Sequence, residues 1–188
     1  MIELKKTGFD RDRKTLFVFF TGGLQAEQKK RFDFEGLARL IAYPAVLVRD
    51  ISGNFYDTPN YDETLDVLSI ICAAWRNGDG RVVFVGTSMG GYAAFKFGAV
   101  IRPDKITAFA PQIEWPGHPD LSPLYRDLRI GIDIHICRTS NYETDARHAQ
   151  TMNRIAGATV FVHDCRVHNV AGVLKERASL MDIVLRDA

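Results

Sequence analysis

The chain has 188 residues, of which 46% are hydrophobic and 25% charged, and its formal net charge is +1. These values are typical of one soluble globular domain with a full core, so residues 1–188 are expected to form a single domain. The balanced charge gives no reason to expect nucleic acid or an anionic membrane as a partner. No apolar run approaches the roughly 18 residues that a membrane span requires.

The first residues are polar and charged, and they lack the apolar core of a signal peptide. We therefore expect a cytoplasmic protein. The cysteines are odd in number and far apart in the sequence, which predicts reduced, buried thiols rather than a disulfide framework or a metal site. They are Cys72, Cys137 and Cys165. No metal and no cofactor is expected.

Predicted strands and helices alternate along the chain, after a charged edge strand or arm at residues 1–14. Apolar runs predict strands at 15–20, 44–48, 82–85, 105–110, 130–137 and 157–162, and helical patterns predict helices at 37–42, 61–76, 92–97, 144–155 and 170–185. This alternation predicts an α/β fold with a mostly parallel central sheet and helices on both faces. Ligands of such sheets bind at the carboxyl ends of the strands.

Two early turns have features that suit a binding site. A pair of glycines, ending at Gly23, directly follows the first buried strand. Glycines there let a backbone amide approach a ligand closely. The loop at 51–60 contains Phe55 and Tyr56, which either line a pocket or pack the loop onto the body of the protein.

Residues 86–90 read Gly-Thr-Ser-Met-Gly and lie between a predicted buried strand and a predicted helix. This arrangement is that of a nucleophile elbow, in which a tight turn holds the serine, here Ser88, in a strained conformation above a helix N-terminus. The amide of Met89 would then point at an oxyanion on the acyl carbon. The second donor is expected from the earlier glycine turn, from Gly23 or, failing that, Leu24.

A glycine-rich turn of a nucleotide-binding sheet is the alternative interpretation of this stretch. Neither the dinucleotide pattern Gly-x-Gly-x-x-Gly nor a phosphate loop ending in Gly-Lys-Ser/Thr occurs at the turn. The strand before the pentapeptide and the helix after it therefore favour the elbow.

The segment from residue 111 to 125 is irregular and rich in proline. We expect it to lie over the strand ends as a small lid. Its aromatic residues Trp115 and Tyr125 are candidates to contact the substrate, together with Phe55 and Tyr56 from the other side of the serine. All four could instead only anchor their loops.

A serine nucleophile needs a base within hydrogen-bond reach, and the base needs an orienting carboxylate. In a fold with an elbow of this kind, the base comes after the last strand in the chain. His168 lies in the loop after that strand, and His163, at the end of the strand, is the alternative. The other histidines are less suitable, because His118 precedes the last two strands, His135 lies within a strand and His148 within a helix.

The loop after the strand at 130–137 offers two carboxylates, Glu143 and Asp145. Either can reach the histidine. An aspartate in the first turn of a helix also offsets the helix dipole, so Asp145 has a purely structural explanation as well. The residues alone leave the choice between the two open.

The pentapeptide at 86–90 resembles the elbow of the α/β-hydrolase superfamily, and residues 15–185 resemble a compact member with almost no cap domain. Further stretches are similar to a bacterial branch that often accompanies glycan biosynthesis, and they lie at residues 48–50, 55–56, 145–149, 168–170 and 174–177.

The resemblance implies a triad of Ser88, an acid and His168, and it favours Asp145 over Glu143 as the acid. Many members of the superfamily have the acid directly after the strand, near residue 140, where this chain has no carboxylate.

These features predict a serine hydrolase, an esterase or deacylase that cleaves a short-chain acyl ester through an acyl-enzyme on Ser88. The expected substrate is a small molecule or an acyl group linked to a glycan. Acyl transfer to another acceptor, thioester cleavage, and a non-catalytic binding or scaffold role of the same fold are the alternatives.

Overall fold

The computed structural model describes residues 1–7, 13–23, 32–114, 116–138 and 143–186. Its central sheet has seven strands, which are β1 (Ile2–Thr7), β2 (Thr15–Phe20), β3 (Ala45–Asp50), β4 (Arg81–Thr87), β5 (Lys105–Phe109), β6 (Gly131–Cys137) and β7 (Thr159–His163). They lie in the order β1-β3-β2-β4-β5-β6-β7. Strand β1 is antiparallel to β3, and the other pairs are parallel. The predicted mostly parallel sheet is therefore confirmed.

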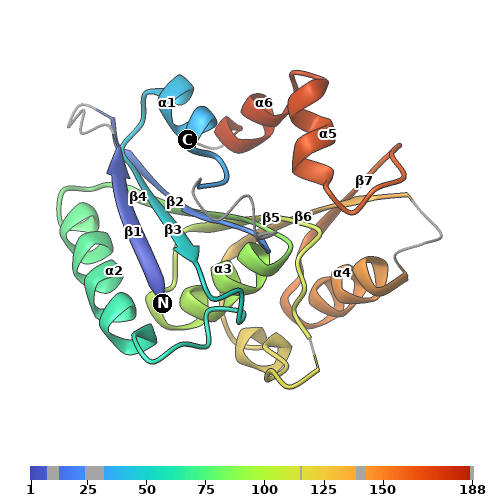
Figure 1. The fold of residues 1–188 in the computed structure, drawn as a ribbon, viewed down its shortest axis with the longest axis horizontal. Helices are drawn as coiled ribbons and strands as arrows, with labels where there is room; N and C mark the ends of the chain where they lie inside the picture. Colours follow the sequence, from blue (N-terminus) through green and yellow to red (C-terminus); the bar gives the residue numbers. More distant parts are fainter. Residues whose placement is uncertain (8–12, 24–31, 115, 139–142, 187–188) are drawn as a thin grey trace.

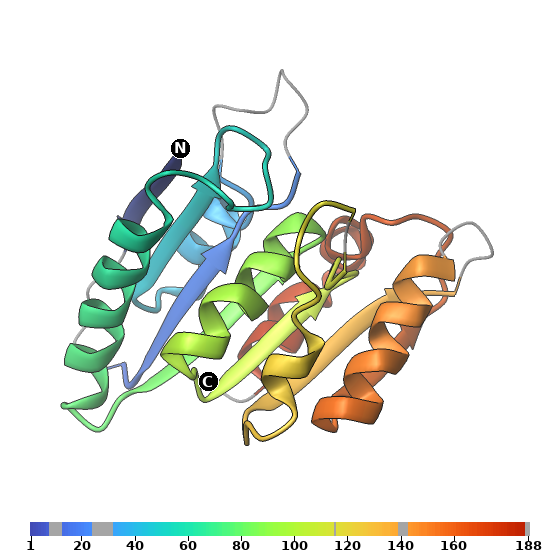
Figure 2. The same cartoon turned by 90° about the horizontal axis from the view of Figure 1, so that it is seen from below.

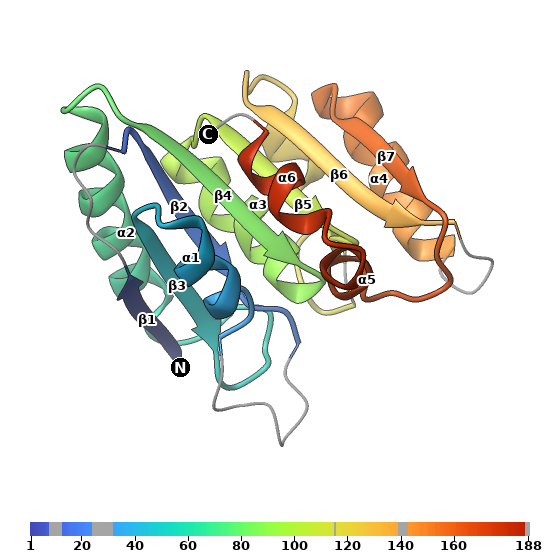
Figure 3. The same cartoon turned by 90° about the horizontal axis from the view of Figure 1, so that it is seen from above.

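Helices cover both faces of the sheet, as predicted. They are α1 (Glu35–Ile41), α2 (Tyr61–Arg76), α3 (Met89–Ile101), α4 (Glu143–Ala156), α5 (Val170–Glu176) and α6 (Leu180–Leu185), with a 3-10 helix η1 at Ser122–Tyr125. Helices α2, α3 and α4 lie on one face and α1, α5 and α6 on the other (Figure 1). Figure 2 shows the first face and Figure 3 the second. Among the described residues, no helix combines the length and apolar character needed to cross a membrane.

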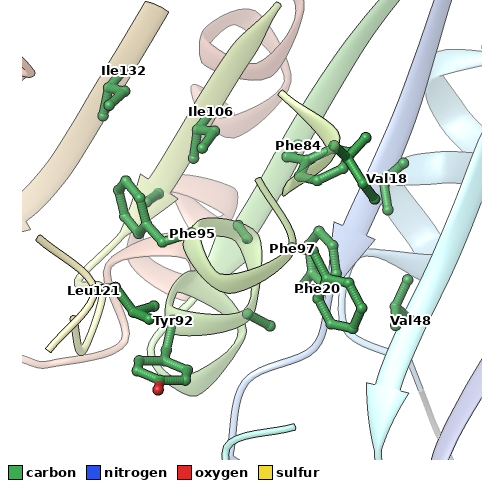
Figure 4. Close-up of a cluster of buried hydrophobic side chains, with 14 of the residues drawn as sticks. Val18, Phe20, Val48, Phe84, Tyr92, Phe95, Phe97, Ile106, Leu121 and Ile132 are labelled. Atoms are coloured by element: carbon green, nitrogen blue, oxygen red, sulfur yellow. The ribbon is translucent and has the colours of Figure 1, made fainter. Parts of the chain in front are cut away.

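The middle of the sheet is buried on both faces, since all six residues of β2 are buried and five of them are apolar. Phe17 and Phe19 point to the α1 side, whereas Phe20 points to the α3 side. There Phe20 stacks on Phe97 with ring centroids 5.5 Å apart and meets Phe84 edge-on at 5.2 Å (Figure 4). Burial of such rings contributes on the order of 2–3 kcal/mol each. Strands β2 and β4 are thereby a rigid base for the turns at their carboxyl ends.

The single helix predicted at 170–185 is in fact two helices. The chain breaks at Ala178, which has a left-handed conformation with φ 56°. The amide of Ala178 donates to the carbonyl of Lys175, and the amide of Ser179 donates to that of Leu174, both at 3.0 Å. No glycine or proline stands at the break to signal it in the sequence. An alanine seldom adopts this conformation, so the break was not expected.

The expectation of three reduced thiols is wrong, because Cys137 and Cys165 form a disulfide with a Cα–Cα distance of 4.9 Å. The two cysteines are 28 residues apart in sequence, but β6 and β7 are adjacent and Cys137 pairs in register with His163. Strand pairing therefore brings together residues that looked widely spaced. Cys72 is free and buried, as predicted, and burial raises the pKa of its thiol to about 11.

Candidate active site

The serine of the predicted elbow lies where β4 ends and α3 begins. Ser88 has φ 52° and ψ −119°, a strained conformation for a residue with a Cβ. Glycines on both sides permit it, since a Cβ on Gly86 would overlap the carbonyl oxygen of Gly90, and one on Gly90 would overlap that of Phe20. The Ser88 amide donates to the carbonyl of Phe109 at 2.9 Å. The turn is thus anchored to the neighbouring strand β5.

A continuous hydrogen-bond chain joins the predicted nucleophile, base and acid. Nε2 of His168 lies 2.8 Å from Oγ of Ser88, and Nδ1 lies 2.9 Å from Oδ2 of Asp145. The Asp145 side chain is only 7% exposed. A buried carboxylate that accepts from Nδ1–H leaves Nε2 as the acceptor for the serine hydroxyl proton. The arrangement can therefore deprotonate the serine as it attacks.

Both candidate acids belong to the first turn of α4, but their side chains point in different directions. Asp145 is buried and faces His168, whereas Glu143 is exposed. Residues two positions apart on a helix are rotated by roughly 200° about its axis, so both cannot face the same partner. The acid is presented by a helix rather than by the segment directly after a strand.

The predicted oxyanion donors are the amides of Met89 and Gly23, with Leu24 as the alternative to Gly23. Leu24 lies outside the described residues. Met89 is the first residue of α3, so its amide has no acceptor within the helix and lies at the positive end of the helix dipole. It is therefore available to an oxygen above Ser88.

The glycine turn after β2 lies directly against the elbow. A Cβ on Gly90 would approach the carbonyl carbon of Thr21 to 2.7 Å, and one on Gly22 would approach the carbonyl oxygen of Thr87 to 2.9 Å. A Cβ on Gly23 would meet none of the described residues within 4 Å. The turn that contains Gly23 is thus packed against the elbow through Thr21 and Gly22.

Two aromatic residues predicted to contact the substrate are instead part of the core, and that prediction is wrong for both. Tyr56 is fully buried, and its hydroxyl lies 2.8 Å from the carbonyl oxygen of Thr21 and 3.1 Å from that of Val48. Tyr125 is also fully buried, and its hydroxyl donates to the carbonyl of Phe95 at 2.6 Å. Each hydroxyl has a backbone partner, which is why these amphipathic side chains can be buried.

Phe55 remains half-buried at the surface and packs on Tyr92 and His118, with ring centroids 5.5 Å and 4.8 Å away. The Tyr92 amide donates to the carbonyl of Ser88 at 3.2 Å, so the cluster packs on a residue of the first turn of α3. Nδ1 of His118 is buried and has no hydrogen-bond partner in the described part of the chain. Trp115, the remaining predicted contact residue, lies outside the described residues.

His163, the alternative base, is held away from the serine by another histidine. Nε2 of His163 lies 2.9 Å from Nδ1 of His135. The His135 ring is stacked between Phe109 and Phe161, with centroid distances of 5.0 Å and 4.7 Å. Burial, with a smaller contribution from His163, lowers the pKa of His135 to about 3. Burial also lowers the pKa of His163, and the pair belongs to the packing of β6 against β7.

Asp50, which the sequence analysis did not single out, shapes the loop that contains the aromatic residues. Its buried carboxylate accepts from the amides of Ser52, Asn54 and Tyr56 at 2.9 Å, 2.7 Å and 3.1 Å. Within this loop Phe55 and Tyr56 have φ of 50° and 57°. The signal for this role was present, because the stretch Asp-Ile-Ser-Gly-Asn at 50–54 is typical of an Asx turn.

The sheet order, the elbow and the His168 loop together define the α/β-hydrolase fold. No protein-family model and no curated protein matches the sequence. The similar solved structures include hydrolases of this fold, among them a CIB-like hydrolase from Thermoplasma acidophilum. That structure has a TM-score of 0.65 and 18% identity, and the alignment covers 100% of this chain and 93% of the other.

Two further similar structures are a capsule O-acetyltransferase and a glycosylation-associated protein complex. The capsule O-acetyltransferase of Neisseria meningitidis serogroup A has a TM-score of 0.72 and 15% identity over 98% of this chain and 91% of its own. The glycosylation-associated Gap123 complex of Streptococcus agalactiae has a TM-score of 0.68 and 18% identity over 93% of this chain. The chain spans only 42% of that protein's length. At these identities the likeness shows the fold alone.

Proposed function

We propose that the protein is a serine hydrolase that cleaves a short-chain acyl ester. The observation that carries the proposal is the hydrogen-bond chain from Ser88 through His168 to Asp145. Oγ of Ser88 attacks the acyl carbon while Nε2 of His168 takes its proton, and the imidazolium then protonates the leaving alkoxide. Water then attacks the acyl-enzyme while His168 again takes and returns the proton, which releases the acid and restores the serine.

The oxyanion of each tetrahedral intermediate is stabilised by the amides of Met89 and Gly23. Both amides come from rigid parts of the fold, the N-terminus of α3 and the turn packed against it. Preorganised donors of this kind need no rearrangement when the charge develops, and each is worth roughly 10²–10³ in rate.

The proposed substrate has a small acyl group on a polar, hydroxylated carrier such as a glycan. The chain between β5 and β6 contains only the short helix η1 among its described residues, rather than an inserted helical cap. The half-buried ring of Phe55 packs on Tyr92, four residues after Ser88, and on His118, whose Nδ1 has no hydrogen-bond partner among the described residues. Flat aromatic faces beside a polar atom suit a sugar ring better than an alkyl chain.

Acetyl and butyryl esters are therefore expected to be hydrolysed faster than esters of about ten carbons or more. Added methylenes increase binding only where an apolar surface buries them, at about 0.8 kcal/mol each. The measurement is kcat/KM across a series of p-nitrophenyl esters. A steady rise up to the dodecanoyl ester would reveal a long apolar tunnel and contradict this substrate class.

Acyl transfer to a sugar hydroxyl is the second candidate, and its support is the similarity to the capsule O-acetyltransferase over nearly the whole chain. The same three residues would form the acyl-enzyme, and a hydroxyl in place of water would then accept the acyl group. Product analysis with an activated acetyl ester, with and without a glycan acceptor, separates the two reactions.

A fluorophosphonate probe is expected to label the wild-type protein, because such probes react with an activated serine and not with an ordinary one. The readout is the mass of the covalent adduct. Complete absence of labelling would favour the remaining alternative, a non-catalytic binding or scaffold protein of this fold.

A cytoplasmic location stays a prediction. The Cys137–Cys165 disulfide weighs against it, because cytoplasmic reductants normally keep such thiols reduced.

A further inference from the structure

The glycine turn is proposed to supply the second oxyanion donor, but the backbone preferences of its own residues do not fix its conformation. Gly22 and Gly23 are consecutive, and glycine has the widest choice of backbone conformation. An oxyanion donor is useful only when it is held about 2.7–3.1 Å from the position of the developing charge. Contacts from elsewhere in the chain must therefore fix this turn.

Asp33, just before α1, makes two reciprocal hydrogen bonds with the turn. Its Oδ2 accepts from the amide of Gly22 at 2.9 Å, and its own amide donates to Oγ1 of Thr21 at 3.2 Å. On the other side of the same peptide unit, the carbonyl oxygen of Thr21 lies 2.8 Å from the hydroxyl of Tyr56. The peptide between Thr21 and Gly22 is thus held at its oxygen and at its nitrogen.

These contacts leave one amide of the turn for a ligand. The Thr21 amide donates to the carbonyl of Val48 at 2.9 Å, and the Gly22 amide donates to Asp33. Within the described part of the chain, the Gly23 amide has no hydrogen-bond partner. The fixed peptide before it limits where that amide can lie, because only φ and ψ of Gly22 separate the two.

We propose that Asp33 is a positioning residue of the oxyanion hole, which holds the Gly22 amide so that the Gly23 amide is presented to the oxyanion. This inference rests on the proposed function and deepens it. Tyr56 assists from the opposite side of the peptide, which gives this buried residue a role other than substrate contact. Burial raises the pKa of the Asp33 carboxyl, while the Gly22 hydrogen bond opposes that rise.

The test compares Asp33→Ala with Asp33→Asn, which keeps an oxygen acceptor for the Gly22 amide. The readouts are kcat and KM for a short-chain ester and the inhibition constant of an alkyl boronic acid. The boronic acid forms a tetrahedral adduct with the serine. We expect Asp33→Ala to lower kcat roughly tenfold to hundredfold, with KM within about twofold and boronate affinity reduced by the same factor as kcat. Asp33→Asn should stay within about threefold of wild type.

The matched control is Asp66→Ala, which removes an exposed carboxylate from α2 and should leave all three constants at wild-type values. Unchanged kcat in Asp33→Ala would overturn the inference, and so would a fall in kcat with unchanged boronate affinity. If Asp33→Ala does not fold, Thr21→Val and Thr21→Ser replace it. Valine removes the acceptor for the Asp33 amide and should reproduce the loss, whereas serine keeps the acceptor and should not; equal behaviour of the two overturns the inference.

The inference and the proposed function fail in different ways. An active wild type with an equally active Asp33→Ala variant refutes only the role of Asp33. A wild-type protein that neither hydrolyses esters nor reacts with the boronic acid and the fluorophosphonate refutes the proposed function, and the role of Asp33 with it.

Discussion

Ser88→Ala is expected to abolish fluorophosphonate labelling and to lower ester turnover by at least about a thousandfold. The substitution removes the only atom that can form the acyl-enzyme in the proposed mechanism. The backbone conformation of the elbow depends on the flanking glycines rather than on the hydroxyl. The variant should therefore fold normally, which circular dichroism and a thermal melt can check.

Ser69→Ala is the matched control, because this serine lies on α2 and its hydroxyl makes no hydrogen bond with the described residues. It should retain both labelling and turnover. A folded Ser88→Ala protein that still reacts with the probe would show that another residue is the nucleophile.

Asp145→Asn is expected to reduce turnover by several orders of magnitude, about ten-thousandfold in the best-studied triad. The asparagine amide can donate to Nδ1 of His168, which stabilises the tautomer with a proton on Nε2. That tautomer cannot take the proton of the Ser88 hydroxyl, 2.8 Å away. The measurement is kcat for a short-chain ester, together with the rate of probe labelling.

Glu143→Gln is the companion variant, because it makes the same chemical change two residues away on the same helix. Its side chain is exposed, so its effect should be small. If Glu143→Gln were the more damaging change, the acid would have to be reassigned to Glu143. Mild effects of both changes would mean that no carboxylate strongly orients the histidine.

Elements with strong local patterns were predictable from the sequence. Strand β2 is a continuous apolar run, and α2 was predicted with the bounds that the structure has. The break between α5 and α6 was not predictable, because Ala178 adopts its left-handed conformation through hydrogen bonds formed in the folded chain rather than through its own preference. The disulfide was missed for a similar reason, since it depends on strand order.

The candidate site was predictable where chain order alone determines the position of a residue. Chain order predicted Ser88 and His168 and left Asp145 and Glu143 as alternatives for the acid, and the structure brings the side chains of Ser88, His168 and Asp145 together. For the other site residues the outcome depended on how deeply each side chain is buried in the folded chain, which the local sequence pattern does not reveal. Tyr56, which looked suited to a pocket, is enclosed, and Asp33 acquires its contacts from a turn eleven residues away.

The Cys137–Cys165 bond also limits how the edge of the sheet can fluctuate. It closes a covalent ring that contains α4, with Asp145, and the whole of β7, while Ser88 and His168 lie outside the ring. Edge strands and their flanking helices are ordinarily among the first parts of a sheet to open in hydrogen exchange. A 28-residue closure removes chain entropy worth on the order of 3–4 kcal/mol from the open state. Redox conditions thus set how often the acid-bearing edge separates from the rest of the sheet.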